Sequence, residues 1–287
     1  MRIDALLREG ITRSFEFFPP KSDDEAVTLA HTLADLETLR PSFVSVTYRG
    51  GPESRQRTYD LVTRLQSEGH LTPMAHLICV GHPRAQMTEI LLHYRDAGVE
   101  NVMALGGDLP EGGDTQRELE HAIDLVELAR EVGSFSIGVA AHPDGHPRSP
   151  DRPSDRRYLA AKLALADFAV TQFFFELTQW THLVEEVGAL GVTKPILPGI
   201  MPVTTISGID RMAAMGASVP ETLVARLRAA HERGGPAAVR AEGIAAATQL
   251  CDALLEAGAP GIHFYTLNRS TATREIHDAL FSRRERT

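Results

Sequence analysis

The chain alternates short apolar segments with longer segments whose apolar residues recur every three or four positions. The short segments are rich in β-branched and aromatic residues, which is typical of buried strands. We expect eight strands, at residues 12–19, 42–48, 72–79, 101–107, 135–141, 167–175, 194–200 and 261–267. The longer segments between them predict helices.

The segment between the third and fourth strands shows the helical pattern clearly. Met87, Ile90 and Tyr94 fall on one face, while Pro83 suits a first turn and Gly98 suits the end of the helix. Regular alternation of strands and helices predicts parallel strands covered by helices. Eight strands in a chain of 287 residues favour a (β/α)₈ TIM barrel over an open sheet.

The stretch between the seventh and eighth strands is longer than one crossover needs. It holds three helical patterns, so we expect extra helices at about 204–258. The sequence contains neither an internal repeat nor a low-complexity linker. We therefore predict one barrel domain that covers residues 1–287.

Composition narrows the class of partner. The 29 basic and 38 acidic residues give a net charge of −9, which argues against nucleic acid as a partner. Two distant cysteines do not form a disulfide framework. The N-terminus lacks a secretory signal, and the apolar stretches are too short to span a bilayer. We expect a soluble, cytoplasmic protein with a small-molecule substrate, and the sequence favours no oligomeric state.

Chemistry in such a barrel sits where the strands end, and the first strand carries a carboxyl group. Ser14, Glu16 and Phe18 share one face of this strand, and Phe15 and Phe17 share the other. We expect Glu16 to lie in an apolar setting, which favours the neutral carboxyl form that can donate a proton. The alternative is a structural glutamate paired with an arginine.

Polar side chains also mark the ends of other strands. Thr47 and His76 end the second and third strands, and Asp108 follows the fourth in a Gly-Gly-Asp turn. Gln172 interrupts a very apolar strand, where a buried amide can recognise the edge of a heterocycle. Arg269 follows the last strand and could hold a carboxylate with two hydrogen bonds.

Two histidines, His142 and His146, raise the question of a metal site. Pro143 and Pro147 place both histidines in a loop, so their spacing does not put them on one helical face, and we predict no metal. A glycine-rich dinucleotide motif and a serine nucleophile elbow are both missing from the sequence. A Schiff-base aldolase is also disfavoured, because Lys194 begins its strand rather than ending it.

Several strings, in order and spread along the chain, resemble the methylenetetrahydrofolate reductase family. They include SFEFFPPK (14–21), PSFVSVTYRGG (41–51), NVMALGGDLP (101–110), ADFAVTQFFF (166–175) and HFYTLNRS (263–270). The resemblance implies a (β/α)₈ barrel that reduces 5,10-methylenetetrahydrofolate to 5-methyltetrahydrofolate with NAD(P)H. It also implies that a missing dinucleotide motif is no objection, because the family binds the nicotinamide at the barrel mouth.

The resemblance assigns roles toward the substrate. Glu16 matches the general acid, and Asp108 matches the aspartate that lies beside the pterin and the flavin. Gln172 matches the residue that binds the pterin edge, and Arg269 matches the arginine that contacts the glutamate tail. We therefore expect Glu16 and Asp108 to be catalytic, with Asp108, Gln172 and Arg269 binding the folate.

The resemblance is weaker on the side of the cofactor. The residues expected to bind it are Thr47, His76, Gly107, His142 and Lys162. Gly106 stands where the family usually has arginine, and His142 stands where it has tyrosine. A basic residue of the following helix is also missing. Two lost charge-assisted hydrogen bonds would weaken flavin binding by about two to four decades. We therefore expect NADH, with NADPH possible, to donate hydride directly, and we doubt that FAD is bound.

Three alternatives stay open at this point. The first is an FAD-dependent ping-pong reductase of the same substrate, and the second is a folate-binding barrel without catalysis. The third is a metal-dependent barrel hydrolase that uses Glu16, His76, Asp108 and His142 as ligands. The third lacks the paired histidines that such enzymes carry on the first strand.

Overall fold

The computed structural model describes residues 1–48, 52–107, 118–217 and 219–284. Its strands are β1 (Thr12–Phe17), β2 (Phe43–Val46), β3 (Pro73–Ile78), β4 (Asn101–Leu105), β5 (Ser136–Ala141), β6 (Phe168–Thr171), β7 (Ile196–Leu197), β8 (Gly199–Ile200) and β9 (Gly261–Tyr265). Its helices are α1 (Ile3–Glu9), α2 (Asp23–Glu37), α3 (Pro52–Glu68), α4 (Arg84–Asp96), α5 (Ala122–Val132), α6 (Arg152–Leu165), α7 (Leu177–Ala189), α8 (Ile206–Ala214), α9 (Glu221–Glu256) and α10 (Thr271–Arg284).

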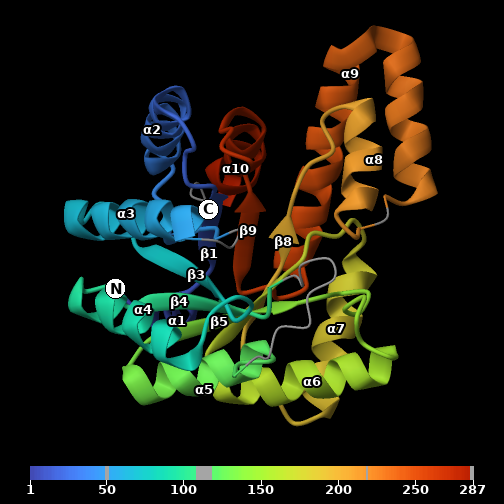
Figure 1. The fold of residues 1–287 in the computed structure, drawn as a ribbon. Helices are drawn as coiled ribbons and strands as arrows, with labels where there is room; N and C mark the ends of the chain where they lie inside the picture. The colour runs from blue at the N-terminus through green and yellow to red at the C-terminus, as the bar shows by residue number, and fades with distance from the viewer. Residues whose placement is uncertain (49–51, 108–117, 218, 285–287) are drawn as a thin grey trace.

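The strands form one parallel sheet in the order β7-β6-β5-β4-β3-β2-β1-β9-β8. Since β7 and β8 are consecutive halves of one segment, the sheet returns on itself, and the expected (β/α)₈ barrel is confirmed (Figure 1). The single strand predicted at 194–200 is wrong in detail. Pro198 has no N–H to donate and divides that segment, while its carbonyl oxygen accepts a 3.0 Å bond from the His263 amide.

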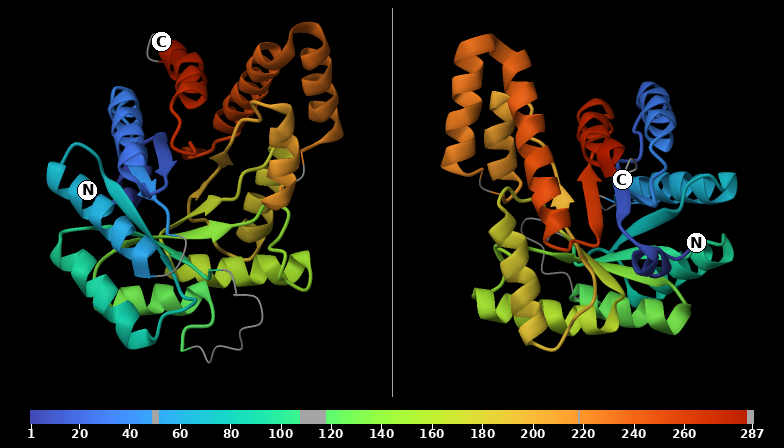
Figure 2. Two further views of the ribbon diagram at one scale, coloured as in Figure 1. Left: turned by 45° about the horizontal axis from the view of Figure 1, so that its top comes forward. Right: turned by 180° about the vertical axis from the view of Figure 1, so that it is seen from behind.

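Helices surround the strands, and the large apolar core lies between the two layers (Figure 2). The alternation along β1 sends Phe15 and Phe17 outward into this core, where Leu29 of α2 also lies. The helix predicted between β3 and β4 is confirmed as α4. Its apolar face is buried, and Gly98 follows its end with a φ of 76°, a value that favours glycine.

The first helix, α1, was not predicted. Ile3 and Leu7 enter the N-terminal end of the barrel and pack there in a cluster with Phe43, Met74 and Phe168 from the strands. This short helix closes the N-terminal end of the barrel like a plug. The half of the barrel interior next to it, called the lower half, is filled by apolar side chains.

The segment between β8 and β9 contains α8 and a long α9. Gly234 and Gly235 leave helical geometry, so α9 consists of two arms, which Figures 1 and 2 show as a hairpin beside α8. The second arm packs tightly on the chain before α8, because a Cβ atom on Gly243 would lie 1.9 Å from the Val203 carbonyl oxygen. Among the described helices, none combines the length and the apolar character needed to cross a membrane.

Candidate active site

The upper half of the barrel interior differs in chemistry from the plugged lower half. Above the apolar cluster, side chains from β1, β2, β3 and β9 form a polar layer at the C-terminal ends of the strands. We call this set the mouth cluster, and it consists of Ser14, Glu16, Ser45, Thr47, His76, His263 and Tyr265.

Glu16 points into the barrel toward two imidazole rings. Its Oε2 atom lies 3.5 Å from His76 Nε2 and 3.7 Å from His263 Nε2, and its side chain is 12% exposed. The expectation of an apolar setting for Glu16 is wrong, because the side chains nearest its carboxyl group inside the barrel are the imidazoles of His76 and His263. A carboxyl group that is partly open to solvent and flanked by ring nitrogens is well placed to exchange a proton.

His263 was missed by the sequence analysis, although it is buried at 1% exposure directly beside Glu16. Its Nδ1 atom lies 2.8 Å from Ser14 Oγ, and its Nε2 atom lies 3.4 Å from Ser45 Oγ. Its ring stacks on Phe43 with a centroid distance of 5.9 Å. These contacts fix the ring in place beside Glu16. The signal was its inward place in the alternating pattern of β9.

His76 and Tyr265 complete the walls around Glu16. Burial holds the pKa of His76 below its ordinary value and outweighs the opposing charge of Glu16, so the imidazole of His76 is neutral near pH 7. The Tyr265 hydroxyl donates a 2.7 Å bond to the Thr171 carbonyl oxygen. Burial raises the pKa of Tyr265 well above its usual value, which keeps it neutral.

Thr47 is 7% exposed and lies just beyond β2. Its backbone is held on both sides, by a 2.9 Å bond from its amide to the Phe17 carbonyl oxygen and a 2.8 Å bond from Thr58 Oγ1 to its own carbonyl oxygen. Within the described chain, its Oγ1 atom is buried without a hydrogen-bond partner. Such an atom costs free energy unless a ligand or water satisfies it.

The loop after β5 brings nitrogen groups to the rim of the barrel. The rings of His142 and His146 lie 4.6 Å apart, and burial lowers the pKa of His142 to about 4. Lys162 reaches back from α6, and its Nζ donates a 2.8 Å bond to the Ala140 carbonyl oxygen. Burial lowers the pKa of Lys162 to about 8. Arg156, a second residue missed from the sequence, donates a 3.0 Å bond to the His142 carbonyl oxygen and fixes the loop.

The chain after β4 turns sharply at Gly107. This residue has a φ of 81°, and a Cβ atom there would lie 3.2 Å from both Ile78 Cβ and Val80 Cβ. Glycine is therefore required by both backbone geometry and space. The predicted catalytic residue Asp108 comes next and lies outside the described residues.

The predicted folate-binding residues lie on different sides of the mouth. The sequence analysis placed Gln172 inside an apolar strand as a buried amide, and this is wrong. Strand β6 ends at Thr171, and Gln172 is half-buried just beyond it. Its Oε1 accepts a 3.1 Å bond from the Phe173 amide, and its Nε2 lies 3.5 Å from the Met215 carbonyl oxygen. Arg269 is exposed after a left-handed turn at Asn268, whose side chain bonds both the amide and the carbonyl of Phe18.

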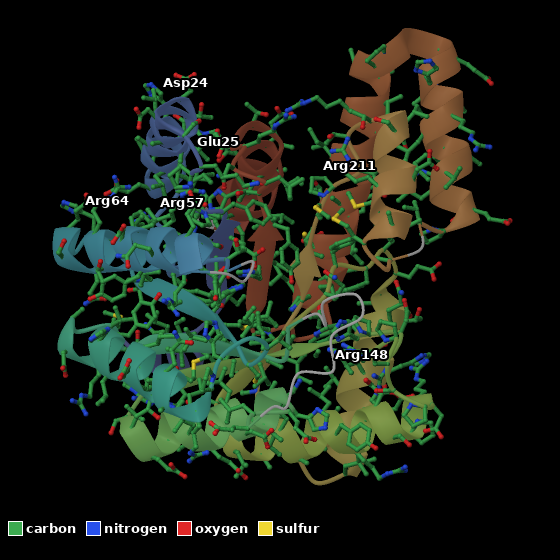
Figure 3. All side chains as sticks on the ribbon, viewed as in Figure 1. Asp24, Glu25, Arg57, Arg64, Arg148 and Arg211 are labelled. Atoms are coloured by element: carbon green, nitrogen blue, oxygen red, sulfur yellow. The ribbon has the colours of Figure 1, made fainter. Side chains whose placement is uncertain are left out.

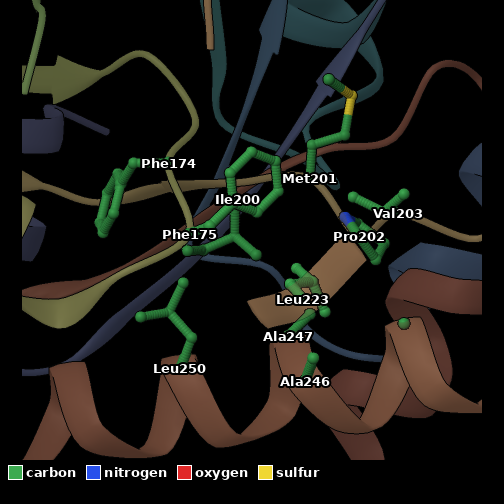
Figure 4. A pocket seen from close by; sticks show the side chains of 11 residues that line it. Phe174, Phe175, Ile200, Met201, Pro202, Val203, Leu223, Ala246, Ala247 and Leu250 are labelled. Atoms are coloured by element: carbon green, nitrogen blue, oxygen red, sulfur yellow. The ribbon is translucent and has the colours of Figure 1, made fainter. Parts of the chain in front are cut away.

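A cavity of about 30 Å³ lies outside the mouth, between the end of β8 and the arms of α9. Its lining includes Phe174, Ile200 and Leu250 (Figure 4). Ligand pockets usually enclose about 300–1,000 Å³. This cavity is therefore a packing gap that is too small for a ligand.

Comparison with known proteins identifies the family of the chain. The family model described as methylenetetrahydrofolate reductase matches residues 2–281. The chain belongs to the methylenetetrahydrofolate reductase family. A 5,10-methylenetetrahydrofolate reductase from Pectobacterium carotovorum is 35% identical over 275 residues, which cover 95% of this chain and 91% of that protein. The Escherichia coli enzyme of the same name is 32% identical over 268 residues, covering 93% of this chain and 89% of its own.

A plant relative and a solved structure extend the comparison. Methylenetetrahydrofolate reductase (NADH) 1 of Arabidopsis thaliana is 34% identical over 285 residues, covering 93% of this chain but 48% of the plant protein. A Clostridium thermocellum protein, described as binding two copies of 5-methyl-5,6,7,8-tetrahydrofolic acid, has a TM-score of 0.66 over 99% of this chain and 100% of its own. At 11% identity this likeness shows the barrel fold of the methylenetetrahydrofolate reductase family and nothing more.

Proposed function

We propose that the protein reduces 5,10-methylenetetrahydrofolate to 5-methyltetrahydrofolate with NAD(P)H. Membership of the family supports the reaction, since relatives that match nearly the whole chain are named for it. The observation that carries the proposal is the position of Glu16. Its carboxyl group lies at the C-terminal end of a barrel strand, the end where the active sites of barrel enzymes are found, and it lies between His76 and His263.

Glu16 is the proton donor in the proposed reaction. Its proton goes to the folate nitrogen that leaves the bridging methylene carbon, which opens the five-membered ring and leaves an iminium carbon. The reduced nicotinamide, when bound, supplies the hydride that this carbon receives. The reaction therefore consumes one proton and one hydride, and Glu16 must regain a proton after each turnover. The adjoining imidazoles of His76 and His263 lie within 4 Å of the carboxyl oxygen that exchanges it.

Substrate contacts are proposed on both sides of the mouth. Arg269 is exposed and has room for a carboxylate, as a contact to the glutamate tail requires. Gln172 offers an amide for the pterin edge. Asp108, which follows Gly107 in the sequence, is proposed to act beside the pterin. We also propose that the chain works as one domain.

The mouth fits a nucleotide cofactor. The buried Thr47 Oγ1 has no hydrogen-bond partner among the described residues, and Lys162 and His142 lie on the neighbouring rim. We propose that NADH binds here and that FAD is not required. The absence of a side chain at Gly106 supports the flavin-free version. The name of the Arabidopsis relative, which specifies NADH, supports the choice of nicotinamide and says nothing of FAD.

The proposal is tested with purified protein and NADH deuterated at the hydride position. We expect no flavin absorbance, oxidation of NADH only when methylenetetrahydrofolate is present, and full retention of deuterium in the methyl product. Added FAD should not change the rate. Stoichiometric bound FAD, or loss of deuterium to solvent through a flavin nitrogen, would establish the ping-pong alternative. Folate binding without NADH oxidation would establish the non-catalytic barrel.

A further inference from the structure

Arg148 extends from the loop between β5 and α6 to the chain that follows the neighbouring strand β4. Its Nη2 atom donates a 3.0 Å bond to the Gly107 carbonyl oxygen. A Cβ atom on Gly106 would lie 3.8 Å from the same nitrogen. The missing side chain at Gly106 therefore leaves the space that this guanidinium enters, beside the two glycines that follow β4. Figure 3 labels Arg148 among the surrounding side chains.

The guanidinium of Arg148 is held in place, and no carboxylate of the described residues pairs with it. Its backbone amide donates a 3.1 Å bond to His146 Nδ1, which anchors the loop. A guanidinium has five N–H donors, and the bond to Gly107 uses one of them. Within the described part of the chain, Arg148 forms no salt bridge, whereas Arg152 and Arg156 both pair with Glu186. The side chain of Arg148 is exposed.

The surroundings of Arg148 favour an anion. The nearby carboxylate of Asp155 is already bonded to the His146 amide at 2.8 Å, to Ser149 Oγ at 3.2 Å and to Arg156 at 2.7 Å. Lys162 adds an ammonium group beneath the same loop. The rim between β4 and β5 therefore presents positive charge and bare backbone.

We propose that Arg148 binds the pyrophosphate group of the dinucleotide cofactor. The planar fork of arginine matches two phosphate oxygens at once, and a backbone without side chains lets the phosphates approach. The inference rests on the proposed function, because it assumes a dinucleotide at this mouth. NADH and FAD both contain a pyrophosphate group, so the proposal is that Arg148 binds this group in whichever dinucleotide is present. The test distinguishes NADH from FAD.

The test measures equilibrium binding of NADH, FAD and inorganic pyrophosphate by calorimetry. We expect Arg148→Ala to weaken binding of the dinucleotide by about 10-fold to 100-fold, because a charge-assisted contact is lost. Inorganic pyrophosphate should compete with NADH in the parent protein and not in Arg148→Ala. Arg148→Lys should fall between the two, since it keeps the charge and loses the fork. The matched control is Arg152→Ala, which removes a nearby exposed arginine that is paired with Glu186 and should bind as the parent does.

A double variant that moves the guanidinium to a neighbouring position controls for folding defects. Gly106 has a backbone that accepts a side chain, so Arg148→Ala combined with Gly106→Arg returns a guanidinium to the same space from β4. We expect this double variant to recover most of the lost affinity. Unchanged affinity in Arg148→Ala, or weaker binding of the folate alone, would overturn the inference while leaving the proposed reaction intact.

The two cofactor arms then distinguish the remaining outcomes. An effect on NADH supports the inference together with the flavin-free proposal. An effect on FAD alone supports the inference and contradicts the flavin-free proposal. If the parent protein bound neither dinucleotide, both the inference and the proposed function would fall.

Discussion

The two ends of the barrel differ in how far their buried polar side chains are hydrogen-bonded. At the N-terminal end, the amide of the fully buried Asn101 makes three hydrogen bonds, accepting from the Ile3 amide and donating to the carbonyls of Met1 and Pro73. At the C-terminal end, Thr47 Oγ1 is buried without a partner within the described chain, and Glu16 meets its neighbours at 3.5 Å and beyond. The same strands contribute to both ends.

This contrast indicates that the closed end of the barrel contributes mainly to stability and the mouth mainly to ligand binding. Buried polar groups that are fully bonded contribute to the stability of the fold, while those left without partners are kept at a cost in stability and can be satisfied by a ligand. The closed end should therefore respond to substitution through unfolding, and the mouth through binding and turnover. Each prediction below tests one side of that division.

The largest effect is expected for Glu16→Gln, which removes the proton donor and keeps the shape of the side chain. Turnover should fall by about 10²-fold to 10⁴-fold, the usual contribution of general acid catalysis. Binding of NADH and folate, and the free energy of unfolding, should change little. The matched control at the other end is Glu9→Gln on α1, which should keep full turnover. A fully active Glu16→Gln enzyme would remove the proposed mechanism.

The next effect concerns the closed end. Asn101→Ala leaves the Ile3 amide and the Pro73 carbonyl without their partner and loosens the plug formed by α1. We expect the free energy of unfolding, measured by urea denaturation, to fall by about 2–4 kcal/mol. Turnover at 25 °C, well below the unfolding transition, should stay at the parent level. A large loss of turnover in folded Asn101→Ala would show that the two ends are not independent.

The third effect is a dependence of stability on pH that arises at the mouth. Burial lowers the pKa of His142 to about 4 in the folded protein, while an unfolded histidine titrates near 6.5. Between these values the unfolded chain binds the additional proton, so His142 makes stability fall as the pH drops from 6.5 to 4, by at most about 3 kcal/mol. His142→Asn should flatten this part of the curve, as followed by urea denaturation at each pH. The control His31→Asn replaces an exposed histidine of α2 and should leave the slope unchanged.

The sequence predicted the strands and the inward face of β1 because alternation with a period of two depends only on local pattern. It could not give the neighbours of Glu16, since these depend on which residues face each other across the barrel. The register pairs Ser14 with His263, and this pairing brings the second imidazole beneath the carboxyl group. The apolar phenylalanines next to Glu16 in sequence instead point outward into the helical layer.

Other features depended on tertiary structure in different ways. Helix α1 has seven residues, which is too short for a stable isolated helix, and it forms because Ile3 and Leu7 find the open end of the barrel. Arg148 lies in a loop with no periodic pattern, so its reach to Gly107 could not be deduced from sequence. The position of Arg148 on the rim therefore required the structure, while the barrel that carries it could be predicted from the sequence.

The smallest effect is expected for Arg269→Ala, which removes an exposed guanidinium from the folate side of the mouth. Because the proposed contact is with the glutamate tail, far from the reacting carbon, it should stabilise ground state and transition state equally. The KM for methylenetetrahydrofolate should therefore rise about 10-fold, equivalent to about 1.4 kcal/mol, with kcat unchanged. A substrate that lacks the glutamate should not distinguish the variant from the parent. Arg274→Ala, which removes a half-buried arginine bonded to Thr38, is the control. An unchanged KM in Arg269→Ala would move the tail contact elsewhere on the rim.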